Sequence, residues 1–317
     1  MRRFILLALV AASVLMPAGT QAADKKVIFI AGRPSHGPLG HEHRAGCLLL
    51  AKCLAGTPGV TTEVHTNGWV SDENVFDGAA AIVIYSDGGG GHPLLKDDRL
   101  ETIGALMKKG VGLGCIHYAV EPTTVKGNKE FQEWIGGCFE TFWSVNPHWD
   151  ADFTTLPKHA VTRGVKPFKT NDEWYYHMRF PSDMSRVTPI LTAMPSERTP
   201  RWNKDKPADA KPSTHGGNPD VWKAVVERKE PQHVMWVTER ADGGRGFGIS
   251  GGHNHLGWGN NDQRKLVLNS ILWIAKADVP AGGVESTVTQ DELMANLDPK
   301  GGPKPAPKKE EPKKEVK

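Results

Sequence analysis

The first half of the chain alternates short apolar runs with segments whose apolar residues recur at helical spacing. The runs predict β-strands that are buried on both faces, and the periodic segments predict helices that connect them. This alternation is typical of an α/β fold with a doubly wound, mostly parallel sheet flanked by helices. The predicted strands are residues 26–31, 61–66, 80–86 and 111–116, and the predicted helices are residues 41–55 and 95–109.

The second half is less regular and richer in aromatic residues. Residues 198–220 are polar and contain four prolines, which indicates a long surface loop or lid. Residues 262–276 form the clearest helical pattern in the chain, and Asn261 or Asp262 can cap its first turn. The strands or strand-like segments predicted in this half are residues 140–153, 173–180, 187–194, 233–240 and 245–250.

The first 23 residues have the pattern of a signal peptide. Arg2 and Arg3 precede an apolar run at residues 4–16, and residues 20–22 provide a small-x-small cleavage site. We therefore expect the mature protein to be exported, to the periplasm or the extracellular space. No second apolar run reaches the roughly 20 residues that span a bilayer, so we expect no stable membrane insertion after cleavage.

The C-terminal stretch ends in a run of lysine, proline and glutamate with almost no apolar content. A segment of this composition cannot bury enough apolar surface to offset the loss of chain entropy on folding. We therefore expect residues 280–317 to form a disordered tail. Residues 24–279 would then be a single α/β domain.

Charge and motif spacing exclude several classes of function. The net charge is only +3, and no basic run interleaved with aromatic residues lies inside the domain, so no nucleic-acid partner is expected. The glycine run at residues 88–91 lacks a following Lys-Ser/Thr, and the first strand lacks a G-x-G-x-x-G turn, so no nucleotide cofactor is expected. The four cysteines have no C-x-x-C spacing, which argues against a thiolate zinc site.

Histidines follow three of the predicted strands. They are His36, His41 and His43 after the first strand, His117 after the fourth, and His253 and His255 after the last. Because the carboxyl ends of parallel strands meet at one edge of a sheet, we expect these imidazoles to converge in one crevice. Together with Glu121, Asp172 or Glu173 they could hold a divalent metal such as zinc, or they could serve as metal-free acid/base groups. The candidate metal ligands are His41, His43, His117 and His253.

The segment at residues 110–121 places several reactive groups where the fourth strand ends: Cys115, His117, Tyr118 and Glu121. A nucleophile elbow of the G-x-C kind needs a glycine two residues before the nucleophile. Measured in that way, His117 falls at the elbow and Cys115 stands where the glycine would be. The spacing therefore favours an imidazole over a thiol, and a cysteine hydrolase that uses Cys115 is the weaker alternative.

Four segments together resemble the ThuA-like (trehalose utilisation) family of the class I glutamine amidotransferase-like superfamily, over residues 26–277. They are VIFIAGRPSHGPLGHEH, GVGLGCIHYA, DEWYYH and GRGFGISGGHNHLGW, at residues 27–43, 110–119, 172–177 and 244–258. The resemblance implies a flavodoxin-like sheet. It also implies that His117 replaces the amidotransferase cysteine, so the protein is not expected to be a glutamine amidotransferase.

The family resemblance implies a sugar-related role and identifies site residues by position. His117, His253 and Glu173 are the expected catalytic residues. The residues expected to bind a small-molecule sugar substrate are His36, His41, Tyr118, His255 and Trp258.

The leading hypothesis is an exported enzyme that cleaves or isomerises a keto-glycoside or a disaccharide derivative. The ketone of a 3-keto-glycoside acidifies the neighbouring C–H bond, so a neutral imidazole could drive elimination. The alternative is a non-catalytic carbohydrate-binding protein on the same fold, because a fold does not determine a function. The sequence leaves the substrate, the metal and the formation of a homo-oligomer open.

Overall fold

The computed structural model describes residues 24–202, 205–207, 210–213 and 217–300. The predicted signal peptide, residues 1–23, lies outside the described residues, as do residues 301–317 of the predicted tail. Within the described part of the chain, no helix is both long enough and apolar enough to cross a membrane.

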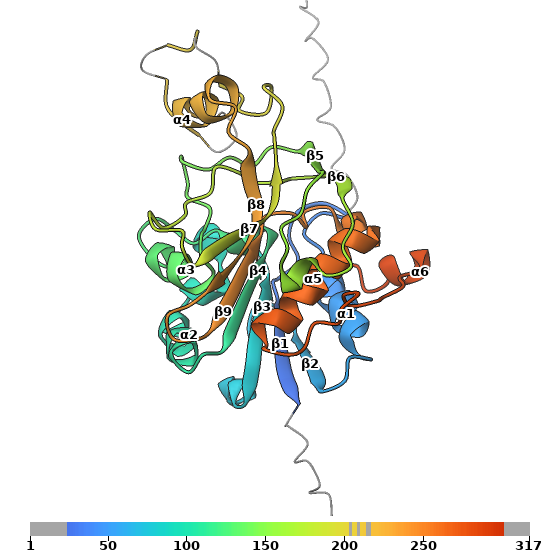
Figure 1. The fold of residues 1–317 in the computed structure, drawn as a ribbon. Helices are drawn as coiled ribbons and strands as arrows, with labels where there is room; N and C mark the ends of the chain where they lie inside the picture. The colour runs from blue at the N-terminus through green and yellow to red at the C-terminus, as the bar shows by residue number, and fades with distance from the viewer. Residues whose placement is uncertain (1–23, 203–204, 208–209, 214–216, 301–317) are drawn as a thin grey trace, which may run out of the picture.

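A seven-stranded sheet forms the centre of the protein (Figure 1). Its first four pairings are parallel, and the two pairings at the β7 edge are antiparallel. The predicted α/β fold with a mostly parallel, flavodoxin-like sheet is therefore confirmed. In spatial order the strands are β2 (Val60–His65), β1 (Lys25–Ala31), β3 (Ala79–Tyr85), β4 (Gly112–Ile116), β9 (Arg245–Ile249), β8 (Gln232–Glu239) and β7 (Val187–Ala193).

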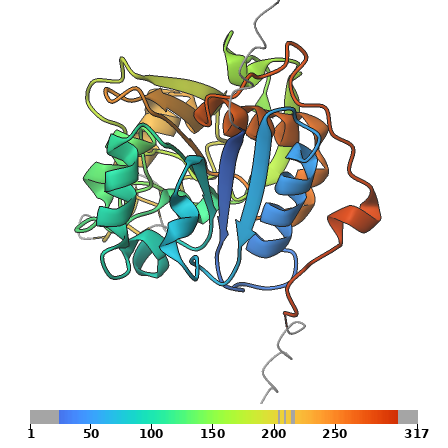
Figure 2. The ribbon, with the colours of Figure 1, turned by 90° about the horizontal axis from the view of Figure 1, so that it is seen from below.

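Helices cover both faces of the sheet, which gives the protein three layers (Figure 2). Side chains of β1 alternate between the faces, so Val27 and Phe29 pack in one apolar cluster while Ile28 and Ile30 pack in the other. The first cluster includes residues of helices α1 (His43–Leu54) and α5 (Asn261–Ile274), and the second includes residues of helices α2 (Arg99–Lys108) and α3 (Asn128–Trp134). A strand buried on both faces needs a continuous apolar run, as the sequence of β1 shows.

A smaller two-stranded antiparallel sheet pairs β5 (Trp149–Phe153) with β6 (Phe168–Asp172). The strand predicted at residues 140–153 is therefore shorter than expected. Residues 173–180, also predicted to be strand-like, form no strand and make only isolated bridges, at Tyr176 and Arg179. His177 has a φ of 57°, in the left-handed region, which an extended strand cannot contain.

Short helical segments connect the main elements. The four-residue helix α4 (Pro219–Trp222) begins at the end of the predicted lid, residues 198–220. The π-helical segment η6 (Lys223–Glu227) follows α4 directly. The 3₁₀ helices are η1 (Glu73–Phe76), η2 (Gly89–Gly91), η3 (Pro93–Leu95), η4 (His117–Val120), η5 (Ala160–Thr162) and η7 (His255–Gly259).

Three helices differ from their predictions. Two begin later than predicted, and one has a different N-cap residue. The first starts at His43 because His41 has a φ of 49°, which a right-handed helix cannot contain. The second predicted helix, residues 95–109, is shorter than expected. Residue 95 belongs to the 3₁₀ helix η3, and α2 starts only at Arg99. The cap of α5 is Asn260, whose side chain accepts hydrogen bonds from the N–H groups of residues 262 and 263, so the predicted caps Asn261 and Asp262 lie inside the helix.

The predicted tail begins too early, because residues 280–300 fold back along the domain. Val284 and Leu293 are buried, and the short helix α6 (Gln290–Leu293) lies beside α1 (Figure 1). Glu42, which is itself buried, lies 3.2 Å from the ammonium of Lys300 and accepts a hydrogen bond of 2.8 Å from the backbone N–H of Asp298. The ordered domain therefore extends beyond residue 279, to residue 300 at least.

A chain that ends at Val279 should be less stable than the full mature chain. Full burial of one aliphatic side chain is worth about 1.5–3 kcal/mol, so loss of Val284 and Leu293 should lower the free energy of unfolding by about 3 kcal/mol or more. Urea denaturation followed by tryptophan fluorescence measures this change. A chain that ends at Lys300 is the control and should match the mature protein. Equal stability of all three chains would contradict the packing described for residues 280–300.

Candidate functional site

A cavity of about 470 Å³ lies where the loops after β1, β4 and β9 come together. These strands are parallel, so their carboxyl ends lie at the same edge of the sheet. His41 follows β1, His117 follows β4 and His253 follows β9. His41 and His253 line the cavity, and His117 lies directly against them. Glu173, directly after β6, closes the group from the side of the smaller sheet.

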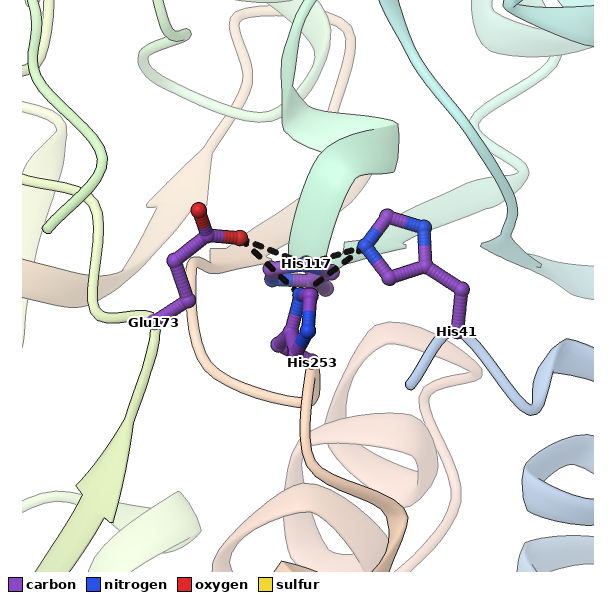
Figure 3. Close-up of side chains that lie close together, drawn as sticks. All are labelled: His41, His117, Glu173 and His253. Carbon is purple, nitrogen blue, oxygen red and sulfur yellow. Dashed lines mark hydrogen bonds and ion pairs between the residues drawn. The ribbon is translucent and has the colours of Figure 1, made fainter. Parts of the chain in front are cut away.

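The four side chains converge on one point (Figure 3). Nε2 of His41 lies 3.1 Å from Nε2 of His117 and 3.0 Å from Nδ1 of His253. Oε2 of Glu173 lies 3.0 Å from Nδ1 of His253 and 3.6 Å from Nε2 of His117. The sequence prediction that histidines from three strand ends share one crevice is therefore supported by the structure.

Two of these imidazoles are oriented by an acceptor on the far side of the ring. Nδ1 of His41 lies 2.7 Å from a carboxylate oxygen of Asp87, and Nδ1 of His117 lies 2.8 Å from the backbone carbonyl oxygen of Ser250. A carboxylate or carbonyl oxygen can only accept, so each Nδ1 carries the proton. When such a ring is neutral, its Nε2 has a lone pair that points into the group.

The protonation of His117 is set by its surroundings. The ring is fully buried, and burial lowers its pKa well below the usual value, with a further decrease from nearby His41 and His253. His117 is therefore a neutral imidazole near pH 7, able to act as a ligand or as a base.

Three imidazoles near the cavity sit on strained backbone. His36, His41 and His117 have φ angles of 60°, 49° and 58°, in the left-handed region that non-glycine residues rarely occupy. Each such residue costs on the order of 1–3 kcal/mol and persists only where its surroundings fix it. At His117 the strain comes from the sharp turn of β4 into η4, which directs the imidazole across the ends of the strands.

Asp172 holds the loop that carries His253. This buried carboxylate accepts hydrogen bonds from the backbone N–H groups of Gly252 at 2.7 Å, Asn254 at 3.1 Å and Glu173 at 2.8 Å. Gly252 has a φ of 114°, so a residue with a Cβ would be strained there. Asp172 thereby fixes the backbone on both sides of His253 and at the N–H of Glu173, and its role is to position these two residues.

Glu173 is held by neutral neighbours on its outer side. Its Oε1 accepts a hydrogen bond of 3.0 Å from the side-chain amide of Asn146. The hydroxyl of Tyr175 donates towards Oε2 of Glu173 at 3.4 Å and lies 3.3 Å from Nε2 of His117. These contacts leave Oε2 directed at the imidazoles.

The expected site residues fall into two groups. His36, His41, Tyr118, Glu173 and His253 line the cavity, and His117 contacts two lining residues, His41 and Tyr175. The structure does not bring the other three expected residues into this group. His43 donates from Nδ1 to the carbonyl of Arg33, and its Nε2 lies 3.8 Å from Asp87, outside the converging group. His255 is fully buried, with Nε2 bonded to the carbonyl of Leu293, and Trp258 is fully buried against Tyr85.

The burial of His255 and Trp258 has a simple cause. The chain turns into η7 at His255, and within this turn the side chains of His255 and Trp258 point into the core. Cys115 is also fully buried, in β4, and burial raises the pKa of its thiol, which disfavours a nucleophilic role.

The sequence argument missed Asp87, Asn146 and His148. Asp87 follows directly after β3 and precedes the glycine run, so its place at a strand end was a usable signal. Asn146 and His148 lie in an irregular segment before β5, and no periodic pattern indicates that this segment reaches the cavity.

The donor set is of the kind that binds a divalent cation. One atom from each of His41, His117, Glu173 and His253 lies within 4.8 Å of the others. Three imidazole nitrogens and a carboxylate oxygen are ligands typical of zinc. The bond from His41 to Asp87 and the bond from His117 to a backbone carbonyl are the outer contacts that orient metal-binding histidines.

Comparison with known proteins supports the fold. The profile of the ThuA family, described as trehalose utilisation, matches residues 30–274. A ThuA-like protein from Bacteroides uniformis is 15% identical, with a TM-score of 0.54 over 82% of this chain and 95% of that chain. One from Parabacteroides merdae is 14% identical, with a TM-score of 0.53 over 84% of this chain and 94% of that chain. No curated protein matches the sequence.

Replacing Asp172 by asparagine should destabilise the protein, because the amide cannot accept all three backbone hydrogen bonds and leaves buried N–H groups unpaired. Hydrogen bonds to charged groups contribute about 1.5–3 kcal/mol each, so a loss of about 3 kcal/mol is expected in urea denaturation. Asp150→Asn, at an exposed position on β5, is the matched control and should change stability little. A similar effect of both substitutions would contradict the positioning role of Asp172.

Proposed function

Because the chain belongs to the ThuA family, whose description is trehalose utilisation, we propose that it processes sugars by cleaving or isomerising a keto-glycoside or a keto-disaccharide. The observation that carries the proposal is the convergence of three imidazoles and one carboxylate beside a cavity of about 470 Å³. A cavity of this size can admit a small sugar. The signal-peptide pattern supports export, so the proposed substrate is a periplasmic or extracellular sugar.

The proposed cofactor is a divalent metal such as zinc. Nε2 of His41, Nε2 of His117, Nδ1 of His253 and Oε2 of Glu173 would hold it. The fit rests on the two Nε2 atoms, which lie 3.1 Å apart while Nδ1 of each ring is bonded to an acceptor on the far side. When bound, the cation would supply Lewis acidity, which polarises a carbonyl oxygen of the substrate.

The remaining groups in the cavity suit a keto-sugar. His36 and His148 line it outside the four-ligand set, so an imidazole is available to accept the proton from the carbon beside the ketone. The aromatic rings of Tyr118, Phe139 and Tyr175 also line it and can pack against the apolar face of a sugar ring. Glu173 and Asn146 are held in place by their mutual hydrogen bond of 3.0 Å.

The purified protein should bind one zinc ion per chain. His117→Ala and Glu173→Gln should each abolish stoichiometric binding, because each removes one of four ligands. Asp87→Asn should weaken zinc binding about 10–100-fold, which is the usual cost of losing an outer contact to a ligand. The measurements are elemental analysis after dialysis and competition with a chromophoric chelator.

His65→Ala is the matched control for zinc binding, since His65 is the last residue of β2 and pairs with Glu63 rather than with the cluster. It should bind zinc as the wild type does. If His117→Ala and Glu173→Gln also kept one zinc per chain, the metal would lie elsewhere and the proposed ligand set would be wrong.

The zinc-loaded protein should convert 3-keto-trehalose to products that mass spectrometry and NMR can identify. Removal of the metal with a chelator should lower turnover at least about 100-fold, and added zinc should restore it. Binding of 3-keto-trehalose by calorimetry without any product would reject the enzyme assignment and favour a carbohydrate-binding protein.

A further inference from the structure

Glu121 is a second carboxyl group of the same cavity, and the four-ligand set does not use it. It follows η4 directly, so the turn that presents His117 also places Glu121. The glycine run after β3 secures its backbone: the N–H of Gly89 donates to the carbonyl of Glu121 at 2.8 Å. A Cβ on Gly88 would lie 2.1 Å from the carbonyl oxygen of Tyr118, so only glycine allows this close approach.

The carboxyl group of Glu121 has no ion-pair partner among the described residues. The hydroxyl of Thr141 donates to its Oε1 at 3.3 Å. The groups that interact with it electrostatically are Glu173, Tyr118, Tyr175 and the thiol of Cys138, and four imidazoles line the same cavity: His36, His41, His148 and His253. No salt bridge to a described side chain therefore offsets the transfer of this carboxyl group out of water.

This environment favours the protonated form. Burial raises the pKa of Glu121 to about 7, with a further increase from the carboxylate of Glu173, while the Thr141 hydrogen bond lowers it. The cavity thus combines a carboxylate directed at three imidazoles with a carboxyl group that keeps its proton near neutral pH. Two carboxyl groups in unlike environments are a recurring arrangement for glycosidic bond cleavage.

We propose that Glu121 is the catalytic acid that protonates the leaving oxygen, and that the substrates are 3-keto-glycosides of a poor leaving group such as a sugar alcohol oxygen. This inference rests on the proposed function. The hydroxyl of a sugar is a very weak acid, so its departure as an alkoxide is unfavourable near pH 7 without a proton donor.

The step balances as a β-elimination. A base takes the proton from C2, beside the C3 ketone, and the C2–H electron pair forms the C1–C2 double bond. The C1–O bond breaks, its electron pair goes to the leaving oxygen, and that oxygen takes the proton of the Glu121 carboxyl group. Glu121 is left as a carboxylate and the base carries the C2 proton. Before the next turnover the base releases that proton to water and Glu121 takes one up from water, so no net proton is gained or lost. Water can then add to the unsaturated product, which makes the net reaction a hydrolysis.

The test is the dependence of turnover on the leaving group. Glu121→Gln retains the shape and the acceptor for Thr141 but cannot donate an acidic proton. With zinc bound, it should lower turnover of 3-keto-trehalose about 100-fold or more, because general acid catalysis contributes about 10²–10⁴-fold. It should change turnover of 4-nitrophenyl 3-keto-α-glucoside less than about threefold, since 4-nitrophenolate leaves without protonation.

The pH profile gives an independent readout. The acid must be protonated to act, so turnover of 3-keto-trehalose by the wild type should fall as pH rises through the pKa of Glu121, which burial raises above its usual value. Turnover by Glu121→Gln should not show this decrease with rising pH. The variant should still bind one zinc ion per chain. Glu133→Gln, at an exposed position on α3, is the matched control and should behave as the wild type.

The outcomes separate this inference from the proposed function. If Glu121→Gln lowers turnover of both substrates equally, or of neither, Glu121 is not the acid although the enzyme assignment stands. If the zinc-loaded wild type converts neither substrate, the proposed function fails and this inference fails with it. Selective loss on 3-keto-trehalose alone supports both.

Discussion

The Nε2 atoms of His41 and His117 face each other at 3.1 Å, and the architecture of the site follows from this contact. Each ring is oriented by an acceptor on its far side, His41 by the carboxylate of Asp87 and His117 by the carbonyl of Ser250. Two such nitrogens can stay this close only where a proton or a cation lies between them. The site therefore favours positive charge at this point, and the nearby carboxylate of Glu173 favours it further.

Keeping these groups together requires a rigid frame. The parallel pairing of β1, β3, β4 and β9 brings residues that are more than 200 positions apart to one edge of the sheet. The loops after these strands adopt strained backbone angles at His41 and His117, which costs free energy. The favourable packing of the sheet offsets this cost. Asp172 adds the last constraint, because it ties the loop of His253 to the backbone of Glu173 through one buried carboxylate.

The sequence was most informative where a single local pattern decides the structure. Apolar runs identified the strands of the central sheet, and the position of histidines after three of them identified the crevice. The sequence predictions failed where the position of a residue depends on how two distant elements pack together. Whether His43 or Glu173 completes the cluster depends on how the smaller sheet sits against the larger one, which no periodic pattern encodes. Likewise, the turn at His255 and the packing of residues 280–300 depend on contacts with distant parts of the chain.

The contact of Lys300 with the first loop also has a consequence for how the protein is made. The ammonium of Lys300 donates to the carbonyl of Gly40 and lies beside Glu42, so the residues on both sides of His41 are secured by a group about 260 positions later in the chain. A growing chain cannot make these contacts until residue 300 has been synthesised. Closing so long a loop also has an entropic cost that contacts between near neighbours avoid. The loop that carries His41 therefore gains this support late, after all the strands of the central sheet have been synthesised.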